Sequence, residues 1–324
     1  MRLFDLHNLT RGELLADIVG SAAFLLFQST VVGLIPAQVL MVVLFNVLFL
    51  ACPLTRRLAV AMLPFVLFEI SYDWMRLWPN YRVNSVDIRG IYEAELSLFG
   101  IGSGQSAMIP CQYFLLHHST VADLLAGLFY LCWVPGPMAF GLWLLFKGET
   151  RWYLRFALAF LVVNFVGFAG YYLHPAAPPW YALQFGFEPD FTTPGNVAGL
   201  ARFDELIGLP VFHNIYVNNS NIFAAVPSLH AAYMLVATVY AVLSRRSWPL
   251  IAVCSLVTVG IWWTAVYTCH HYVIDVLLGI CTATIGIILF EQMLKHITSF
   301  RRIFNRYAAY IDLFPDEFGN DVQT

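Results

Sequence analysis

Charged residues are scarce in this chain of 324 residues: Asp, Glu, Lys and Arg together make up 11%, whereas hydrophobic residues make up 60%. An ordinary soluble domain carries about 25% charged residues. The composition therefore excludes a typical soluble protein and indicates a polytopic membrane protein. The formal net charge is −3, and basic residues gather only at the cytosolic rim described below. The sequence thus gives no reason to expect a nucleic-acid partner.

Sequence motifs that bind metals or nucleotides are also missing. The six cysteines are scattered, and none forms a CxxC pair or a metal-binding spacing. There is no glycine-rich phosphate loop, and no carboxylate-rich cluster of the kind that Mg²⁺ or Ca²⁺ prefers. We therefore expect no metal and no cofactor, so that any chemistry depends on side chains alone.

Long apolar runs divide the chain into predicted membrane spans. A helix needs about 20 predominantly apolar residues to cross a bilayer. Eight runs approach this length, and the boundary between the first two is only Ile35-Pro36. The runs cover residues 15–34, 37–54, 58–78, 121–146, 153–173, 227–243, 248–268 and 272–291. The sequence predicts an all-α fold, a polytopic membrane helix bundle with about eight transmembrane helices.

The distribution of Lys and Arg orients these spans. With a cytosolic N-terminus, thirteen of the 17 Lys and Arg residues fall in cytosolic segments, as the positive-inside rule requires of short loops. Both termini are then cytosolic, and the long loops 79–120 and 174–226 lie on the outer side. We expect an integral protein of a bacterial inner membrane, with the outer side in the periplasm, or of a Golgi-type membrane, with the outer side in the lumen.

Two short polar clusters begin predicted spans on the outer side. The first contains Ser228 and His230, and the second contains His271 and Asp275. Ionisable groups at bilayer depth are costly unless they are paired, so they mark candidate functional sites. A single His near a helix end is usually only a satisfied polar residue. Two clusters at the same predicted membrane face are a much rarer coincidence.

The spacing of the second cluster suggests a catalytic nucleophile. His271 and Asp275 are four residues apart, so on a helix they share a face. The carboxylate can then accept a hydrogen bond from one ring nitrogen and leave the other with a free lone pair. His271 is then a nucleophile or base oriented by a second group, and the two clusters together suggest two histidines that flank a phosphorus atom, one attacking it and the other protonating the leaving oxygen. His270 points about 100° away from His271 on a helix, and it lacks a carboxylate four residues on.

Other polar and aromatic residues are candidates for substrate binding. A helix N-terminus at Ser228 favours a phosphate. Asp73 and Arg76 share a face of the third predicted span with Glu69; they either form an internal ion pair or touch a headgroup near the outer end. The stretch from Ile91 to Phe99, which contains Glu93 and Glu95, is amphipathic and could seat a short helix in the interface plane. A cap over the bundle without chemistry is the simpler interpretation of that stretch.

A proline-rich segment opens the second outer loop, where three prolines within five residues end the preceding span. Trp180 and Tyr181 in this segment suit the headgroup level of a membrane. They act either as a rigid interfacial anchor or as a lining for lipid entry.

The two polar clusters together carry a family resemblance. Pro227-Ser228-Leu229-His230, followed by His271-x-x-x-Asp275, resembles the second and third signature motifs of the type 2 phosphatidic acid phosphatase superfamily. With Ala177-Pro178-Pro179-Trp180-Tyr181, the chain looks like the inositol phosphorylceramide synthase branch and its bacterial relatives. The resemblance covers about residues 120–290. It implies a six-helix phosphatase-like core and catalysis by His230, His271 and Asp275.

This assignment divides the chain into three parts. Residues 1–118 form N-terminal membrane helices and an outer loop, residues 119–295 form the catalytic membrane core, and residues 296–324 form a cytosolic tail.

The basic residues of the superfamily motifs are replaced in this chain. The first motif of the phosphatase branch has Lys and then Arg ahead of a Pro, whereas His174 precedes Pro175 here and Gly167 stands seven residues before His174. The third motif usually carries an Arg six residues before its His, where this chain has Ala265. An Arg fork is the natural clamp for a doubly charged phosphomonoester. A site without these cations is better suited to a phosphodiester, with His174, Ser228 and Arg76 left to bind the phosphate.

The resemblance and its departures together predict a lipid phosphotransferase. We expect it to move a phospho-headgroup, phosphoinositol by resemblance, from a phospholipid donor to a ceramide-like lipid alcohol through a phosphohistidine intermediate. The alternatives are a lipid phosphate phosphatase that uses the same His–Asp pair and a non-catalytic lipid-binding or transport protein that retains the fold. The expected substrate-binding residues are Ser228, His174, Trp180, Tyr181, Asp73 and Arg76.

Overall fold

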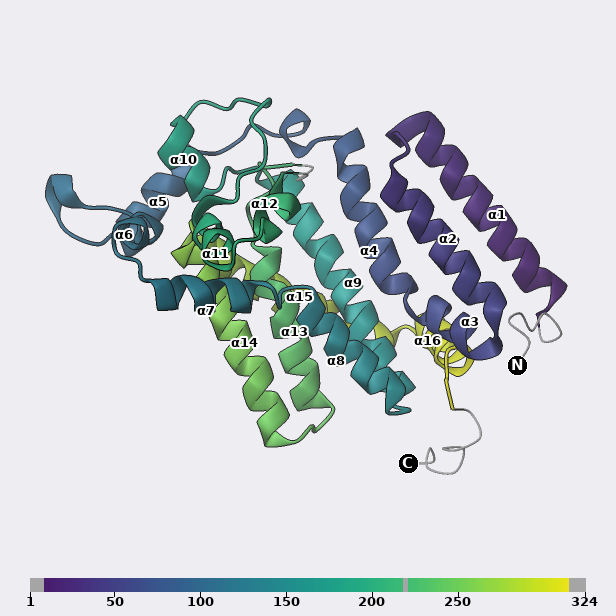
Figure 1. Ribbon diagram of the computed structural model, residues 1–324. Coiled ribbons are helices and arrows are strands. Elements are labelled where there is room, and N and C mark those ends of the chain that lie inside the picture. Colours follow the sequence, from purple (N-terminus) through teal and green to yellow (C-terminus); the bar gives the residue numbers. More distant parts are fainter. Residues whose placement is uncertain (1–8, 218–220, 315–324) are drawn as a thin grey trace.

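The computed structural model describes residues 9–217 and 221–314, and these residues are mostly helical (Figure 1). Extended pairing in the described residues is confined to isolated bridges, in which Ala176 pairs with both Asp87 and Ala224, and Ile101 pairs with Met108. The all-α fold predicted from the apolar runs is therefore confirmed.

Four helical segments are long and apolar enough to cross a membrane on their own. They are α1 (Arg11–Phe27), which continues as a π-helical turn over Gln28–Val32, α9 (Thr150–Leu173), α14 (Trp248–Tyr267) and α15 (Val273–His296). Two bent pairs bring the candidate spans to six, each with an angle of 44° between its halves. These pairs are α3 (Pro53–Ala61) with α4 (Leu63–Trp74), and α7 (Thr120–Tyr130) with α8 (Pro135–Phe146).

The described chain thus offers four to six spans by length, rather than the predicted count of about eight. The remaining two apolar helices, α2 (Pro36–Ala51) and α13 (Leu229–Leu243), have 16 and 15 residues. At 1.5 Å per residue they extend only about 24 and 22 Å, which is less than the hydrocarbon thickness of about 30 Å. A proline begins α2 and another begins the following helix α3. Proline disfavours helical backbone at the residue before it, so each proline ends the preceding helix.

The predicted span 121–146 is broken in its middle. Ser119 caps the start of α7 by accepting a hydrogen bond from the Ala122 N–H at 3.3 Å. Helix α8 restarts at Pro135, a residue suited to a first helical turn. Figure 1 shows α7 running across the bundle, whereas α8 runs along it. The break therefore places residues 131–134, which are all half-buried, near the middle of an otherwise apolar run.

Helix α9 forms the centre of the bundle. It packs against α4, α8, α13 and α15, and 13 of its 24 residues are buried. Close approach to α15 depends on a small residue, because a Cβ added at Gly286 would lie 2.6 Å from a side-chain carbon of Val163. Interfaces between membrane helices favour small residues for this reason.

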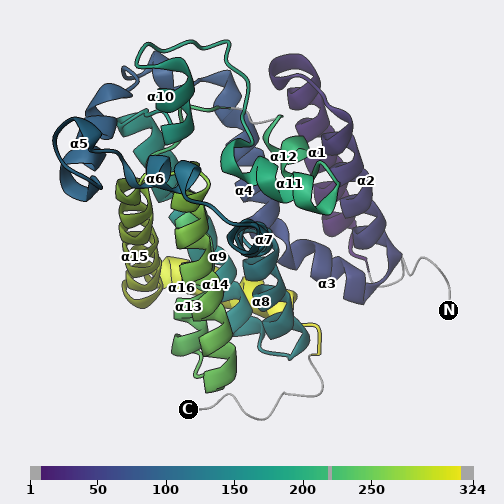
Figure 2. The ribbon, with the colours of Figure 1, turned by 60° about the vertical axis from the view of Figure 1, so that its left-hand side comes forward.

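The N-terminal helices α1 and α2 lie at the edge of the bundle beside α4 (Figures 1 and 2). Most of their large apolar side chains are exposed, as expected of helices that face lipid. Polar contacts join them to each other and to α4. Asn46 donates to the Ser21 hydroxyl at 2.9 Å, and the Trp74 indole N–H donates to the Gln28 side chain at 3.3 Å.

Short helices from the two predicted outer loops cover the end of the bundle where α9 ends and α15 begins (Figures 1 and 2). They include α5 (Arg89–Phe99) and α6 (Pro110–Leu116) from the first loop. The second loop contributes α10 (Pro179–Phe185), α11 (Ala201–Ile207) and α12 (Val211–Tyr216). The amphipathic stretch 91–99 is thus helical, within α5.

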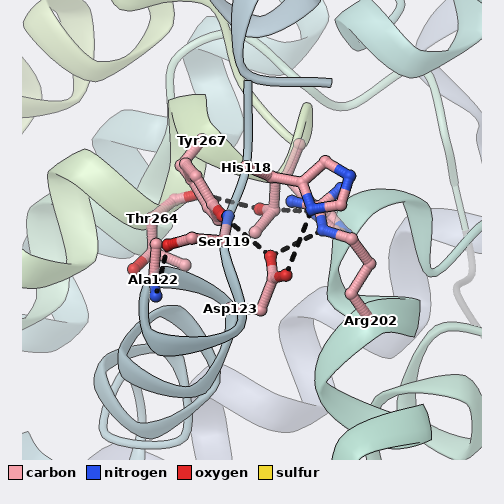
Figure 3. Close-up of polar contacts among 9 residues, drawn as sticks. His118, Ser119, Ala122, Asp123, Arg202, Thr264 and Tyr267 are labelled. Atoms are coloured by element: carbon pink, nitrogen blue, oxygen red, sulfur yellow. Dashed lines mark hydrogen bonds and ion pairs between the residues drawn. The ribbon is translucent and has the colours of Figure 1, made fainter. Parts of the chain in front are cut away.

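One buried carboxylate, that of Asp123, joins α7, α11 and the end of α14 (Figure 3). Asp123 of α7 accepts hydrogen bonds from the Arg202 Nε at 2.6 Å and from the Tyr267 hydroxyl at 2.8 Å. The His118 Nδ1 lies 3.4 Å from its other oxygen. Asp123 is 6% exposed, so it joins α11 and the end of α14 to α7 in a largely desolvated setting.

The C-terminal part predicted as a cytosolic tail includes a further helix, α16 (Thr298–Tyr310). This helix buries Phe304 and Ala308 and packs against α9 and α15. The Tyr307 hydroxyl donates to the Val60 carbonyl at 2.7 Å, which connects α16 to α3. The described part of this segment is therefore bound to the membrane helices.

Replacing Asp123 with Ala tests the three-helix junction. The change leaves the Arg202 guanidinium partly buried without its carboxylate, and removing one partner of such a pair costs about 3 kcal/mol. We expect the Asp123→Ala variant to unfold at a clearly lower temperature in detergent. Glu205→Ala, which removes an exposed carboxylate from the same helix as Arg202, is the matched control and should leave the midpoint unchanged. Equal midpoints for both variants would contradict the assigned role of Asp123.

Candidate active site

His271 and Asp275 meet where α14 passes into α15. The Asp275 Oδ2 lies 3.3 Å from the His271 Nδ1 and accepts a hydrogen bond from the Tyr272 N–H at 3.0 Å. Asp275 is fully buried, and His271 is 5% exposed. With Nδ1 donating to the carboxylate, the His271 Nε2 keeps its lone pair. The arrangement provides a nitrogen nucleophile oriented by a carboxylate.

The local backbone differs from the predicted shared helix face. Helix α15 begins at Val273, so His271 lies in the preceding turn and Asp275 in the first helical turn. The backbone of this turn is bonded to the end of α14, because the His271 N–H donates to the Ala265 carbonyl at 2.9 Å. An acidic side chain in a first helical turn can bond the backbone just before the helix. Asp275 does so at the Tyr272 N–H, and this bond places its carboxylate next to the His271 ring.

His271 is neutral in this environment. Burial lowers its pKa to about 3, well below that of an exposed imidazole. At pH 7 the ring therefore carries one proton, on the nitrogen that faces Asp275. The free lone pair needed for attack on phosphorus is present without any prior loss of a proton.

His230 faces His271 from the first turn of α13. Its Nδ1 lies 3.0 Å from the His271 Nε2. Because the His271 Nε2 is the acceptor, we infer that the His230 Nδ1 carries the proton between them. The His230 ring stacks on Tyr130 at a centroid distance of 5.1 Å and lies 4.5 Å from Trp133. These two aromatic residues pack against the ring of the second histidine.

The N-termini of α13 and α15 come together at this site. The Ser228 N–H donates to the Asp275 carbonyl at 3.0 Å. A Cβ at Gly279 would lie only 2.2 Å from the Ser228 carbonyl oxygen, so glycine is required for this approach. Each helix N-terminus carries a partial positive charge. The start of α13 therefore offers a positive dipole end to a phosphate without a cationic side chain, whereas the N–H groups at the start of α15 already bond Glu95 and Asp275.

A residue of the first outer loop caps α15. Glu95 of α5 is 1% exposed, and its two oxygens accept hydrogen bonds from the Val273 and Ile274 N–H groups at 2.8 and 3.1 Å. Burial raises the pKa of Glu95, and the two backbone hydrogen bonds partly oppose this effect. α5 therefore does more than cover the bundle, because Glu95 satisfies the first N–H groups of the helix that carries Asp275.

A cavity of about 510 Å³ opens beside the two histidines. Apolar and aromatic side chains form most of its wall, and among the described residues that line it there is no Lys or Arg. His270 also borders the cavity; its Nδ1 lies 3.0 Å from the Thr268 hydroxyl, and its ring packs against Tyr216 at 4.5 Å. Apolar pockets with a few convergent polar groups are the usual form of a lipid or small-molecule site.

The predicted substrate-binding residues fall into two groups. Trp180 borders the cavity together with Pro178. Ser228 is adjacent to the catalytic pair but fully buried, where its hydroxyl accepts from the Ala231 N–H at 3.3 Å as the cap of α13. Its contribution to phosphate binding is thus the helix end rather than its side chain.

The other four predicted residues do not line the cavity. The Tyr181 hydroxyl donates to the Glu188 carbonyl and accepts from the Asp190 N–H, so it anchors the outer loop. His174 is half exposed and lies 3.3 Å from Asp87. Asp73 and Arg76 form the internal ion pair that the sequence offered as one interpretation, and Asp73 also accepts from Gln38 of α2. The α4 side chains that reach the cavity are instead Phe68, Glu69 and Tyr72.

Sequence comparison agrees with this geometry. The sequence pattern of the PAP2 superfamily matches residues 104–289, more than half of the chain. The chain belongs to the PAP2 superfamily. The family resemblance seen in the two histidine motifs is confirmed, and the match includes His230, His271 and Asp275 but not Glu69 or Glu95.

The curated relatives carry inositol phosphorylceramide synthase names. A phosphoinositol dihydroceramide synthase from Bacteroides thetaiotaomicron is 57% identical over 302 residues, which cover 93% of this chain and 99% of that protein. An inositol phosphorylceramide synthase from Candida albicans is 27% identical over 57% of this chain and 41% of its own length. The catalytic subunit of the Saccharomyces cerevisiae enzyme is 34% identical over 36% of this chain and 29% of its own length. No solved structure matches the chain.

Replacing Glu95 with Ala tests the cap of α15. The first N–H groups of the helix lose their acceptor, and loss of a helix cap costs about 1 to 2 kcal/mol. We expect a lower unfolding midpoint in detergent and a reduced turnover number, since Asp275 lies in that first turn. Glu93→Ala, on the same helix but exposed, should change neither quantity. If Glu95→Ala matches the wild type in both, α5 does not position the catalytic helix.

Proposed function

We propose that this protein transfers phosphoinositol from phosphatidylinositol to a ceramide-type lipid alcohol, with His271 as the nucleophile. The observation that carries the proposal is the His230–His271–Asp275 relay at the wall of the cavity. The 57% identity to a phosphoinositol dihydroceramide synthase over almost the whole chain supports the choice of donor and acceptor. Dihydroceramide is therefore the first acceptor to test.

The reaction proceeds in two displacements. The His271 Nε2 attacks phosphorus, the bond from phosphorus to the diacylglycerol oxygen breaks, and His230, which is in the imidazolium form when the anionic phosphodiester is bound, donates its Nδ1 proton to that oxygen and becomes neutral. The intermediate is a phosphohistidine diester that retains inositol. The acceptor hydroxyl then gives its proton to His230 and attacks phosphorus, and the bond between phosphorus and His271 breaks. Each displacement conserves charge and protons within the site.

The two histidines must separate before the phosphate binds. A nucleophile approaches its target at about 3 Å, and the proton donor needs a further hydrogen bond of about 3 Å to the leaving oxygen. The observed 3.0 Å between the His230 Nδ1 and the His271 Nε2 leaves no room for phosphorus. Rotation of the His230 side chain away from His271 would open the site, because His271 is the ring fixed by both backbone and carboxylate.

The absence of Lys and Arg from the described cavity wall favours a phosphodiester substrate. A diester carries one negative charge, which the dipole end of α13 can stabilise without a full cation. A phosphomonoester carries close to two and favours an Arg fork. The same feature argues against hydrolysis of lipid phosphates, the activity of the phosphatase alternative. The intact histidine pair argues against a purely non-catalytic role.

We place the site at the outer face of the membrane, in the periplasm or in a lumen. His271 begins α15, and the 24-residue helix extends about 36 Å from the site. Lys295 and the arginines of α16 follow at its far end, and the start of α9 adds Arg151 and Arg155 there. A concentration of basic residues at the end opposite the site is what the positive-inside rule associates with the cytosolic side.

Headgroup-labelled phosphatidylinositol and dihydroceramide in mixed micelles test the proposed reaction. We expect a new labelled lipid that depends on the acceptor, is absent with His271→Ala, and is reduced about 100-fold or more with Asp275→Asn because the ring loses its orienting carboxylate. Glu93→Gln serves as the control substitution. Release of water-soluble label without a new lipid would contradict the transferase and indicate hydrolysis.

A further inference from the structure

Glu69 places a carboxylate on the cavity wall at membrane depth. It belongs to α4, in the candidate span formed by α3 and α4, and it is solvent accessible along the cavity. Within residues 9–217 and 221–314, Glu69 has no hydrogen-bond or ion-pair partner. A charged group inside a membrane helix is costly and is retained chiefly where it serves a substrate or ion. Its unsatisfied oxygens are therefore candidates for contact with a ligand.

Several other polar side chains of the wall are bonded within the protein, although the His270 Nε2 has no hydrogen-bond partner among the described residues. Four of them use their polar atoms in side-chain hydrogen bonds of 2.6 to 3.2 Å. The pairs are Tyr233 with Asn164, Tyr216 with Tyr130, Asn196 with Gln184, and Asn221 with Asn80. A ligand that replaces water in the cavity would gain little from these groups, whereas Glu69 can accept hydrogen bonds at both oxygens.

The position of Glu69 separates it from the reacting phosphorus. Its neighbour Phe68 contacts Tyr233 at a centroid distance of 5.7 Å. Tyr233 contacts Trp133 at 5.8 Å, and Trp133 contacts His230 at 4.5 Å. This series of ring contacts joins the Glu69 turn of α4 to the catalytic histidine through two aromatic rings. Glu69 is not a hydrogen-bond partner of His230 or His271, and its charge would repel a phosphate placed beside it.

We propose that the Glu69 carboxylate accepts hydrogen bonds from hydroxyl groups of the bound lipid, and that this contact selects substrates rich in hydroxyls. Two parts of the substrates carry such hydroxyl groups. The inositol ring of the donor has most of them, and the acceptor alcohol supplies the others. Hydrogen bonds to a charged acceptor are among the stronger ones in proteins. The inference rests on the proposed function for the identity of the donor.

Glu69 lies outside the part of the chain that matches the PAP2 superfamily, which begins at residue 104. The matched part supplies the histidine relay, and α4 supplies the one acidic side chain among the described residues of the cavity wall. Phosphoryl transfer and recognition of hydroxyls are thereby assigned to different parts of the sequence. An N-terminal helix that only supported the bundle would not need an unpaired carboxylate facing the cavity.

The Glu69→Gln variant tests this assignment, because it preserves shape and removes the charge. We expect the KM for phosphatidylinositol to rise about tenfold or more, with a much smaller change in kcat, since the group does not touch the reacting atoms. A rise in the KM for dihydroceramide instead would support hydroxyl recognition and assign it to the acceptor. KM values within twofold of the wild type for both lipids would overturn the proposal.

Two controls separate this result from other causes. Glu93→Gln, an exposed Glu on α5, should leave both KM values unchanged, and the unfolding midpoint of lipid-free Glu69→Gln should equal that of the wild type.

If the wild type forms no product from phosphatidylinositol, the proposed function fails, and Glu69 is tested by binding alone. Phosphatidylinositol should then raise the midpoint of the wild type more than that of Glu69→Gln, and equal shifts would overturn the proposal.

Discussion

The close contact between the N-termini of α13 and α15 is the constraint on which the rest of the site depends. The Ser228 N–H bonds the Asp275 carbonyl, and glycine at position 279 allows the two backbones to approach. This contact brings His230 within 3.0 Å of His271 although they are 41 residues apart in the chain. It also places the N-terminus of α13 beside the two histidines, which gives the phosphate a positive dipole end in a wall without cationic side chains.

Much of the remaining structure serves to hold that contact in place. Glu95 caps α15 from the first outer loop, and Tyr130 and Trp133 hold the His230 ring from the break between α7 and α8. Asp123 then fastens α7 to α11 and to the end of α14, immediately before the turn that carries His271. The short outer helices are thus a rigid support for catalysis rather than a loose cover.

Local sequence patterns were sufficient to predict the helical membrane fold and the three candidate catalytic residues. Apolar runs identify membrane helices because the bilayer imposes their length, and His271 lies close enough to Asp275 for their contact to be local. The number of full spans was less predictable, because α2 and α13 are short and two other runs bend at 44°. The contact of Glu95 with α15 joins residues 178 apart, and no local period reveals such a pair. Charge alone likewise could not show that Asp73 turns toward Gln38 while Glu69 faces the cavity.

The measurement that tests the central claim most directly is identification of the covalent intermediate. Purified protein would be incubated with phosphatidylinositol without acceptor, quenched at alkaline pH and analysed by peptide mass spectrometry. The account predicts a phosphoinositol adduct on His271 that disappears when dihydroceramide is added, is absent from His271→Ala, and persists in His270→Ala. Product formation without an adduct at His271, or an adduct on a different side chain, would contradict it.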